Sequence, residues 1–158
     1  QLEGQRASHT LSRVYLALTE GHWSNQSKSG LIDRPIEKVP DCFNRYQVSD
    51  AGRPSRTEYE VLSEFTYEET PFSLVRLKLQ TGRTHQIRVH MASLSHPLLG
   101  DSIYGHEGFL GFDRAALHSF EITCQLPGHQ DLAVFSSEMP EDFQKMIDKS
   151  INFSSTLI

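Results

Sequence analysis

The sequence predicts an α+β fold, and three observations carry that prediction. Several short segments alternate apolar with polar residues, as strands with one buried face do. Two other segments place their apolar residues at helical spacing. Strands and helices also follow one another without the regular rhythm of βαβ units, which favours α+β. With 158 residues, 37% of them apolar, the chain can bury one core, so we expect a single domain, or a large part of one, over residues 1–158.

The predicted elements follow from these periods in chain order. A β-prone strand at 13–18 is followed by a turn signal at 19–22. Residues 57–62 and 74–80 alternate as two half-buried strands, and the acidic segment 63–72 between them suits a hairpin turn. The remaining elements are a helix at 85–94 with Ile87, Met91 and Leu94 on one stripe, strands at 117–126 and 132–135, and a helix at 140–148.

Two stretches show no clear period. Residues 22–54 are rich in Ser, Asn, Asp, Gly and Pro with only scattered apolar residues, and we expect a long irregular insertion there with one short strand. A loop of this length in a compact domain is usually functional or mobile. Residues 149–158 are expected to form a tail.

Composition argues against several classes of protein. No apolar run approaches the roughly 18 to 20 residues of a membrane span, so we expect a soluble protein with no membrane partner. Cys42 and Cys124 lie far apart with no second Cys near either, a pattern that fits neither a disulfide framework nor a paired-Cys zinc site and is typical of reduced thiols in the cytoplasm. The spacing of His85, His90 and His96 does not bring their rings to one helix face, so no metal is expected.

One stretch of the chain is basic although the chain as a whole is acidic. The formal net charge of −5 argues against indiscriminate binding to nucleic acid. Residues 71–100 nevertheless contain no Asp or Glu, and hold Arg76, Lys78, Arg83 and Arg88 together with three histidines. Two interpretations stay open: a basic binding surface, or a solvated patch whose carboxylate partners come from elsewhere in the fold.

The segment 78–90 is the strongest candidate for a binding site. It is predicted as the end of a strand, a glycine turn and the start of a helix. That arrangement directs free backbone N–H groups at one point, and Arg83, His85 and Arg88 surround the point with further donors. An anion would bind well there, although a basic helix start is also common on plain surfaces.

The run TGRTHQIRVHMASLSHPLLGDSIYG, at residues 81–105, resembles the signature of RluA-type RNA pseudouridine synthases almost position for position. Weaker similarities to the same family occur at 14–18, 57–59, 117–119 and 139–143. The resemblance implies the second half of the family's catalytic domain, with a mixed, largely antiparallel sheet and flanking helices. It also implies ribosomal or transfer RNA as the partner and a reaction without metal or organic cofactor.

The resemblance also implies roles for individual residues. Tyr15 matches the tyrosine that stacks on the extruded uracil and removes the C5 proton. Arg88 matches the arginine that pairs with the nucleophilic aspartate and keeps it ionised. Arg83 and His85 are expected to contact phosphate or support the loop, and Arg76 and Lys78 are further candidates for RNA binding. For Tyr15 an ordinary strand aromatic, and for Arg88 a purely structural carboxylate partner, remain alternatives.

The family's His-Arg-Leu-Asp segment, which supplies the catalytic aspartate, has no counterpart in this sequence. Asp101 matches a structural position of the family and is not assigned as the nucleophile, so Arg88 is expected to lack its family partner. We therefore expect a fragment of a longer enzyme that is inactive alone, with a non-catalytic RNA-binding module as the alternative. A missing half would also expose a sheet edge and favour self-association.

Overall fold

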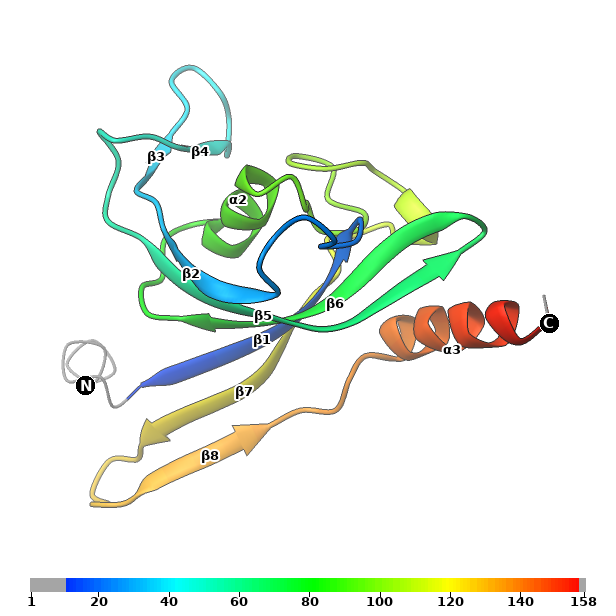
Figure 1. The fold of residues 1–158 in the computed structure, drawn as a ribbon. Coiled ribbons are helices and arrows are strands. Elements are labelled where there is room, and N and C mark those ends of the chain that lie inside the picture. The colour runs from blue at the N-terminus through cyan, green and yellow to red at the C-terminus, as the bar shows by residue number, and fades with distance from the viewer. Residues whose placement is uncertain (1–10, 157–158) are drawn as a thin grey trace.

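The computed structural model describes residues 11–156, whose main feature is a six-stranded sheet in the order β2-β5-β6-β1-β7-β8 (Figure 1). Every pairing in it is antiparallel. The α+β class predicted from the sequence is confirmed. The elements are β1 (Ser12–Glu20), β2 (Ser29–Asp33), β3 (Ile36–Lys38), β4 (Tyr46–Val48), β5 (Arg56–Tyr67), β6 (Thr70–Leu79), α2 (Gln86–Ser93), η1 (Phe109–Gly111), β7 (Leu117–Gln125), β8 (Leu132–Ser136) and α3 (Glu141–Thr156).

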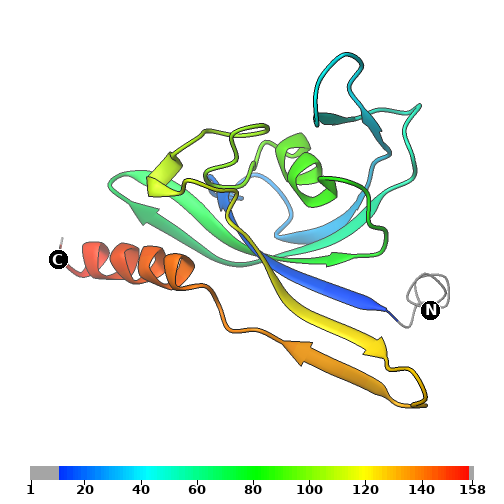
Figure 2. The same ribbon diagram turned by 180° about the vertical axis from the view of Figure 1, so that it is seen from behind.

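Apolar side chains cover both faces of the sheet, with α2 on one face and α3 on the other (Figure 1, Figure 2). β1 lies between β6 and β7 and contributes to both cores. Leu16 and Leu18 pack in the cluster that includes Phe143 of α3, whereas Ala17 packs in the cluster that includes Met91 of α2. This two-sided burial explains why the middle of β1 is a continuous apolar run. None of the helices described for residues 11–156 is long and apolar enough to cross a membrane.

β5 and β6 form a hairpin that continues almost to its tip. Their pairing runs to Tyr67 opposite Thr70, so the connection is shorter than the predicted segment 63–72. Glu68 and Glu69 make the turn with φ of 47° and 63°, the left-handed backbone that a tight two-residue hairpin needs. Phe65 stacks on Phe72 with ring centroids 5.2 Å apart, which extends the apolar contact beyond the predicted ends of the strands.

The insertion at 22–54 is more ordered than predicted, because it contains three short strands where one was expected. The segment forms β2, which pairs with the edge of β5, and the separate hairpin β3–β4. Few residues of the segment are both apolar and buried, and they do not repeat with the period of a strand or a helix. Ile32 and Ile36 are among them, at 4% and 3% exposed. Trp23, 1% exposed, stacks between Tyr59 and His96 at centroid distances of 5.0 and 4.0 Å and fixes the start of the segment.

The predicted tail at 149–158 was also wrong as far as residue 156, because α3 continues to that point. Ser150 is buried and continues the stripe of Phe143, Met146 and Ile147. Its hydroxyl donates to the Ile147 carbonyl at 2.7 Å, so a polar residue occupies a core position at little cost. In the sequence, that serine interrupts the apolar period. Residues 157 and 158 lie outside the described part of the chain.

A buried glutamine joins the start of α2 to β5. Gln86 is 2% exposed, and its side-chain oxygen accepts from the Thr81 hydroxyl at 2.8 Å and from the Arg83 N–H at 3.0 Å. Its amide nitrogen donates to the Arg56 carbonyl and to the Thr57 hydroxyl, both at 2.9 Å. Both polar atoms therefore have two partners, which is the condition for burying an amide without loss of stability.

His90 extends this network and is held neutral by it. Because the Arg34 carbonyl can only accept, the ring Nε2, 3.0 Å away, carries the proton and donates. Nδ1 then accepts from the Thr57 hydroxyl at 2.8 Å. Burial lowers the pKa of His90 below its ordinary value.

This burial predicts a loss of stability on acidification. The unfolded chain takes up a proton on His90 before the folded chain does, so the free energy of unfolding should fall as the pH drops below about 6.5, by at most about 1.4 kcal/mol per pH unit. Urea unfolding between about pH 7.5 and about pH 5.5 measures this dependence. The His90→Gln variant should show a weaker dependence; equal slopes for both proteins would contradict the prediction.

Candidate active site

Arg88 on α2 forms a bidentate ion pair with Asp101 in the loop that follows the helix. Its Nε donates to Oδ2 at 2.7 Å and its Nη2 to Oδ1 at 2.6 Å. The Asp101 side chain is fully buried and that of Arg88 is 18% exposed. Arg88, expected to lack its family partner, therefore has a carboxylate partner in Asp101. Which carboxylate pairs with Arg88 could not be predicted, because only the fold of the loop brings Asp101 to it.

Asp101 is ionised and its oxygens are occupied. Burial alone would raise its pKa, but the hydrogen bonds from Arg88 and from the backbone N–H groups of Ile103 and Tyr104 leave the pKa below its ordinary value. The two N–H groups lie 3.0 and 3.1 Å from Oδ1. A buried carboxylate that accepts four hydrogen bonds is poorly suited to attack a sugar carbon, so the geometry supports a positioning role.

The ion pair leaves one edge of the guanidinium available. Within residues 11–156, Nη1 of Arg88 has no hydrogen-bond partner, whereas Nε and Nη2 are engaged by Asp101. The guanidinium carbon lies 5.0 Å from the centroid of the Tyr104 ring. Asp101 and Tyr104 thus orient Arg88 so that Nη1 can bind a second anion.

Tyr104 also connects α2 to the β3–β4 hairpin. Its hydroxyl oxygen accepts from the Tyr46 N–H at 2.9 Å and lies 2.9 Å from Nδ1 of His85. Burial, followed by the charge of Arg88, lowers the pKa of His85. In a neutral His85, Nδ1 accepts a hydrogen bond from the Tyr104 hydroxyl, and the ring proton is on Nε2. His85 caps α2 with φ of 54°, a left-handed backbone that histidine adopts more readily than most residues.

The structure places Tyr15 on the same face of the sheet as α2. Tyr15 is partly buried against the core cluster that contains Ile87 and Met91 of that helix. In the sheet it lies between Leu77 of β6 and Ser119 of β7. The two residues predicted to be catalytic, Tyr15 and Arg88, are therefore on one side of the molecule.

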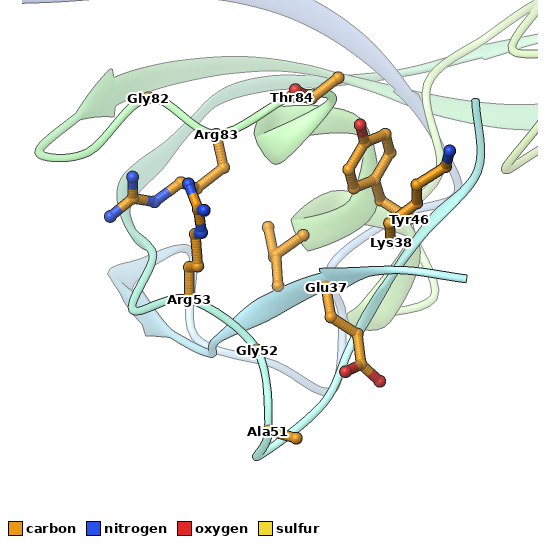
Figure 3. Close-up of a pocket in the computed structure, with 10 residues that line it drawn as sticks. Glu37, Lys38, Tyr46, Ala51, Gly52, Arg53, Gly82, Arg83 and Thr84 are labelled. Atoms are coloured by element: carbon orange, nitrogen blue, oxygen red, sulfur yellow. The ribbon is translucent and has the colours of Figure 1, made fainter. Parts of the chain in front are cut away.

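Arg83 is exposed in the turn that precedes α2 and faces a cavity of about 500 Å³ (Figure 3). Its Nε donates to the Pro54 carbonyl at 3.3 Å. The other wall comes from the β3–β4 hairpin and the segment after it. The lining residues are Ile36, Glu37, Lys38, Tyr46, Ala51, Gly52, Arg53, Gly82, Arg83 and Thr84.

Arg76 and Lys78 lie on the opposite face of the sheet from Arg83 and His85. On β6 they alternate with Leu77, which belongs to the core beneath α2. In the register, Arg76 is opposite Glu60 and Lys78 is opposite Glu58, and Arg76 approaches Glu60 to 3.9 Å. The structure thus places a carboxylate-bearing residue opposite each of these two cations and does not bring them to the site around Arg88. Across the described chain, no three His, Cys, Asp or Glu side chains are grouped so that they could hold a metal ion.

The comparisons with known proteins agree on one family. A family model described as RNA pseudouridylate synthase matches residues 1–93. The chain is 39% identical to an uncharacterized RNA pseudouridine synthase, YhcT, of Bacillus subtilis, over 92% of this chain and 46% of that protein. It is 35% identical to ribosomal large subunit pseudouridine synthase D of Nitrosomonas europaea, over 92% of this chain and 43% of the relative. The chain thus spans about half the length of these curated relatives.

Solved structures show the same likeness. Human RNA pseudouridylate synthase domain containing 1 superposes with a TM-score of 0.71 and 28% identity, over 86% of this chain and 58% of that one. Human RNA pseudouridylate synthase domain containing 4 has a TM-score of 0.68 over 94% of this chain and 66% of that one. Its 19% identity supports a shared fold alone.

Removal of the Asp101 charge should destabilise the fold. The Asp101→Asn variant leaves the Arg88 guanidinium partly buried without its counter-charge, so we expect a loss of about 3 kcal/mol in the free energy of unfolding. The Glu141→Gln variant breaks the exposed pair with Lys145 and should cost less than about 1 kcal/mol. Urea unfolding of both variants makes the comparison, and equal small losses would show that the Arg88–Asp101 pair is not structural.

Proposed function

The chain belongs to the RNA pseudouridylate synthase family, and we propose that it contributes to the isomerisation of uridine to pseudouridine in ribosomal or transfer RNA. One observation carries the proposal: Arg88 is oriented by Asp101 with Nη1 unoccupied, on the face of the sheet where Tyr15 lies. The reaction breaks the N1–C1′ bond of uridine, joins C5 to C1′ and releases the C5 proton while N1 gains one. It requires no electron transfer, so no redox cofactor is invoked.

Arg88 is proposed to hold the carboxylate that acts on the sugar. A guanidinium edge at Nη1 would keep that carboxylate ionised in a partly dry pocket. The sequence has no His-Arg-Leu-Asp segment, so the proposal assigns no nucleophile to this chain. Asp101 acts instead as the positioning residue for Arg88.

Tyr15 is proposed to receive the extruded uracil. A base that leaves its stack loses stacking energy, and an aromatic face replaces part of it. The phenol would then be near C5 of the rotated base and could take its proton. Arg83 and His85 are proposed to hold the RNA backbone at the start of α2, where phosphate contacts fix the position of the strand.

Two substitutions test the catalytic proposal. Arg88→Lys removes the bidentate geometry while keeping the charge and should lower the rate of pseudouridine formation about 100-fold or more. Tyr15→Phe keeps the stacking face but removes the hydroxyl, so it should slow the reaction with little loss of RNA affinity. Transcribed ribosomal and transfer RNA are incubated with the 158-residue chain and with the protein encoded by the complete reading frame, and pseudouridine is mapped chemically.

The control is Lys145→Ala on the exposed face of α3, which should leave the rate unchanged. Wild-type activity that survives Arg88→Lys in a folded protein would overturn the proposed role. If neither protein forms pseudouridine but both bind RNA in a salt-dependent way, the chain is a non-catalytic RNA-binding module.

We also propose that a second copy of the chain pairs along β8. Leu132, Val134 and Phe135 of this edge strand are 54%, 60% and 50% exposed, an uncommon accumulation of apolar surface beside unpaired backbone groups. Val134→Lys should shift the 158-residue chain from dimer towards monomer in sedimentation experiments. Phe43→Ser, at a residue 98% exposed in the loop between β3 and β4, is the control. A wild-type monomer at all concentrations would contradict the proposal.

A further inference from the structure

We propose that the cavity between the β3–β4 hairpin and the turn at 82–84, here called the hairpin cavity, binds a backbone phosphate of the RNA strand next to the reacting nucleotide. This inference rests on the proposed function and adds Arg53 and Lys38 to the residues that hold the substrate. The cavity of about 500 Å³ has the size of sites for small ligands, and it is large enough for one nucleotide.

The walls of the hairpin cavity are fixed by backbone contacts. The N–H of Arg53 donates to the Ile36 carbonyl at 2.8 Å, and the N–H of Ile36 donates to the Arg53 carbonyl at 3.0 Å. Gly52 passes so close to Ile36 that a Cβ at position 52 would lie 2.5 Å from the Ile36 carbonyl carbon. The far end of the hairpin is held by the hydrogen bond between the Tyr46 N–H and the Tyr104 hydroxyl.

The charge of the hairpin cavity is positive and not neutralised within the described chain. Arg53, Arg83 and Lys38 line it, and the acidic lining residue is Glu37, so three cations face one carboxylate. None of the three cations forms an ion pair with any residue of 11–156. Figure 3 shows the two arginines on one side of the cavity and Lys38 with Tyr46 on the other.

This combination fits a phosphodiester better than a smaller anion. Two guanidinium groups on one wall can each donate to a non-bridging oxygen, as arginine does at phosphate sites. Tyr46 on the other wall offers an aromatic surface to a base or ribose. Because the whole chain has a net charge of −5, the local surplus of cations is a feature of this cavity and not of the protein.

The position of the hairpin cavity connects it to Arg88. Arg83 leads directly into α2, and the hydrogen bonds of Tyr104 join the hairpin to His85 on the same helix. A phosphate held between Arg53 and Arg83 would therefore orient the strand relative to the reacting uridine without touching the reacting atoms. Substitution in the hairpin should consequently change KM and leave kcat nearly unaltered.

The test uses the protein encoded by the complete reading frame and a fluorescein-labelled oligouridylate of about 20 nucleotides. The double variant Lys38→Gln with Arg53→Gln should weaken binding roughly tenfold and lower the slope of log Kd against log salt by about 0.7 for each phosphate contact removed. The control variant Lys145→Gln with Lys149→Gln makes the same change in net charge on α3 and should bind like the wild type.

Several outcomes separate this inference from the proposed function. Weaker binding by the hairpin variant, with raised KM for transcribed RNA and unchanged kcat, supports the hairpin cavity. If the hairpin variant binds more weakly but the wild type makes no pseudouridine, phosphate binding by the hairpin cavity is supported and the catalytic proposal is contradicted. If the wild type is active and the hairpin variant binds the oligouridylate as tightly as the control does, the hairpin cavity does not bind an RNA phosphate. Tighter binding of a phosphoserine peptide than of the oligouridylate by the wild type would also overturn the inference.

Discussion

The ion pair between Arg88 and Asp101 is the contact on which the geometry of the candidate site depends. It joins α2 to the loop after it, and that loop is joined to the centre of the sheet by the hydrogen bond from the Leu99 N–H to the Leu18 carbonyl, 3.0 Å long. Burial of a carboxylate is costly, and the four hydrogen bonds to Asp101 offset that cost. The direction of the guanidinium is thereby set by the fold itself, which is the condition for preorganised electrostatics.

The same helix is fixed from its other side by buried polar groups. Gln86 and His90 connect α2 to Thr57 and to the backbone of β5 and of the segment after β2. A helix of eight residues has little stability of its own. Its position therefore depends on directional hydrogen bonds on one face and on the ion pair with Asp101 on another. Ile87 and Met91 add apolar packing against the core.

Sequence reasoning found the elements whose packing leaves a regular period. β6 alternates buried and exposed residues in its second half, and α2 buries Ile87 and Met91 at helical spacing. β1, which is buried on both faces, was found instead from its run of β-prone residues, and all three elements were predicted near their observed positions. It missed β2 to β4 because these strands gain stability from pairing and from isolated contacts such as Trp23, which no local pattern encodes. For the site, the resemblance to the family led to both Arg88 and Tyr15, but the partnership of Arg88 with Asp101 depends on the path of a loop. The alternation at 74–80 already separated Lys78 from Leu77, but only the packing of the folded chain showed that the Leu77 face lies beneath α2.

The single tryptophan of the chain, buried between Tyr59 and His96, gives the molecule an internal optical reporter. Its indole joins the connection after β1 to strand β5 and to the loop that follows α2, so three segments distant in sequence share one chromophore. Any event that loosens this edge of the sheet will expose the indole to water and redden its emission. Local opening of the layer that contains α2 can thus be followed by intrinsic fluorescence, separately from the unfolding of α3 on the far face.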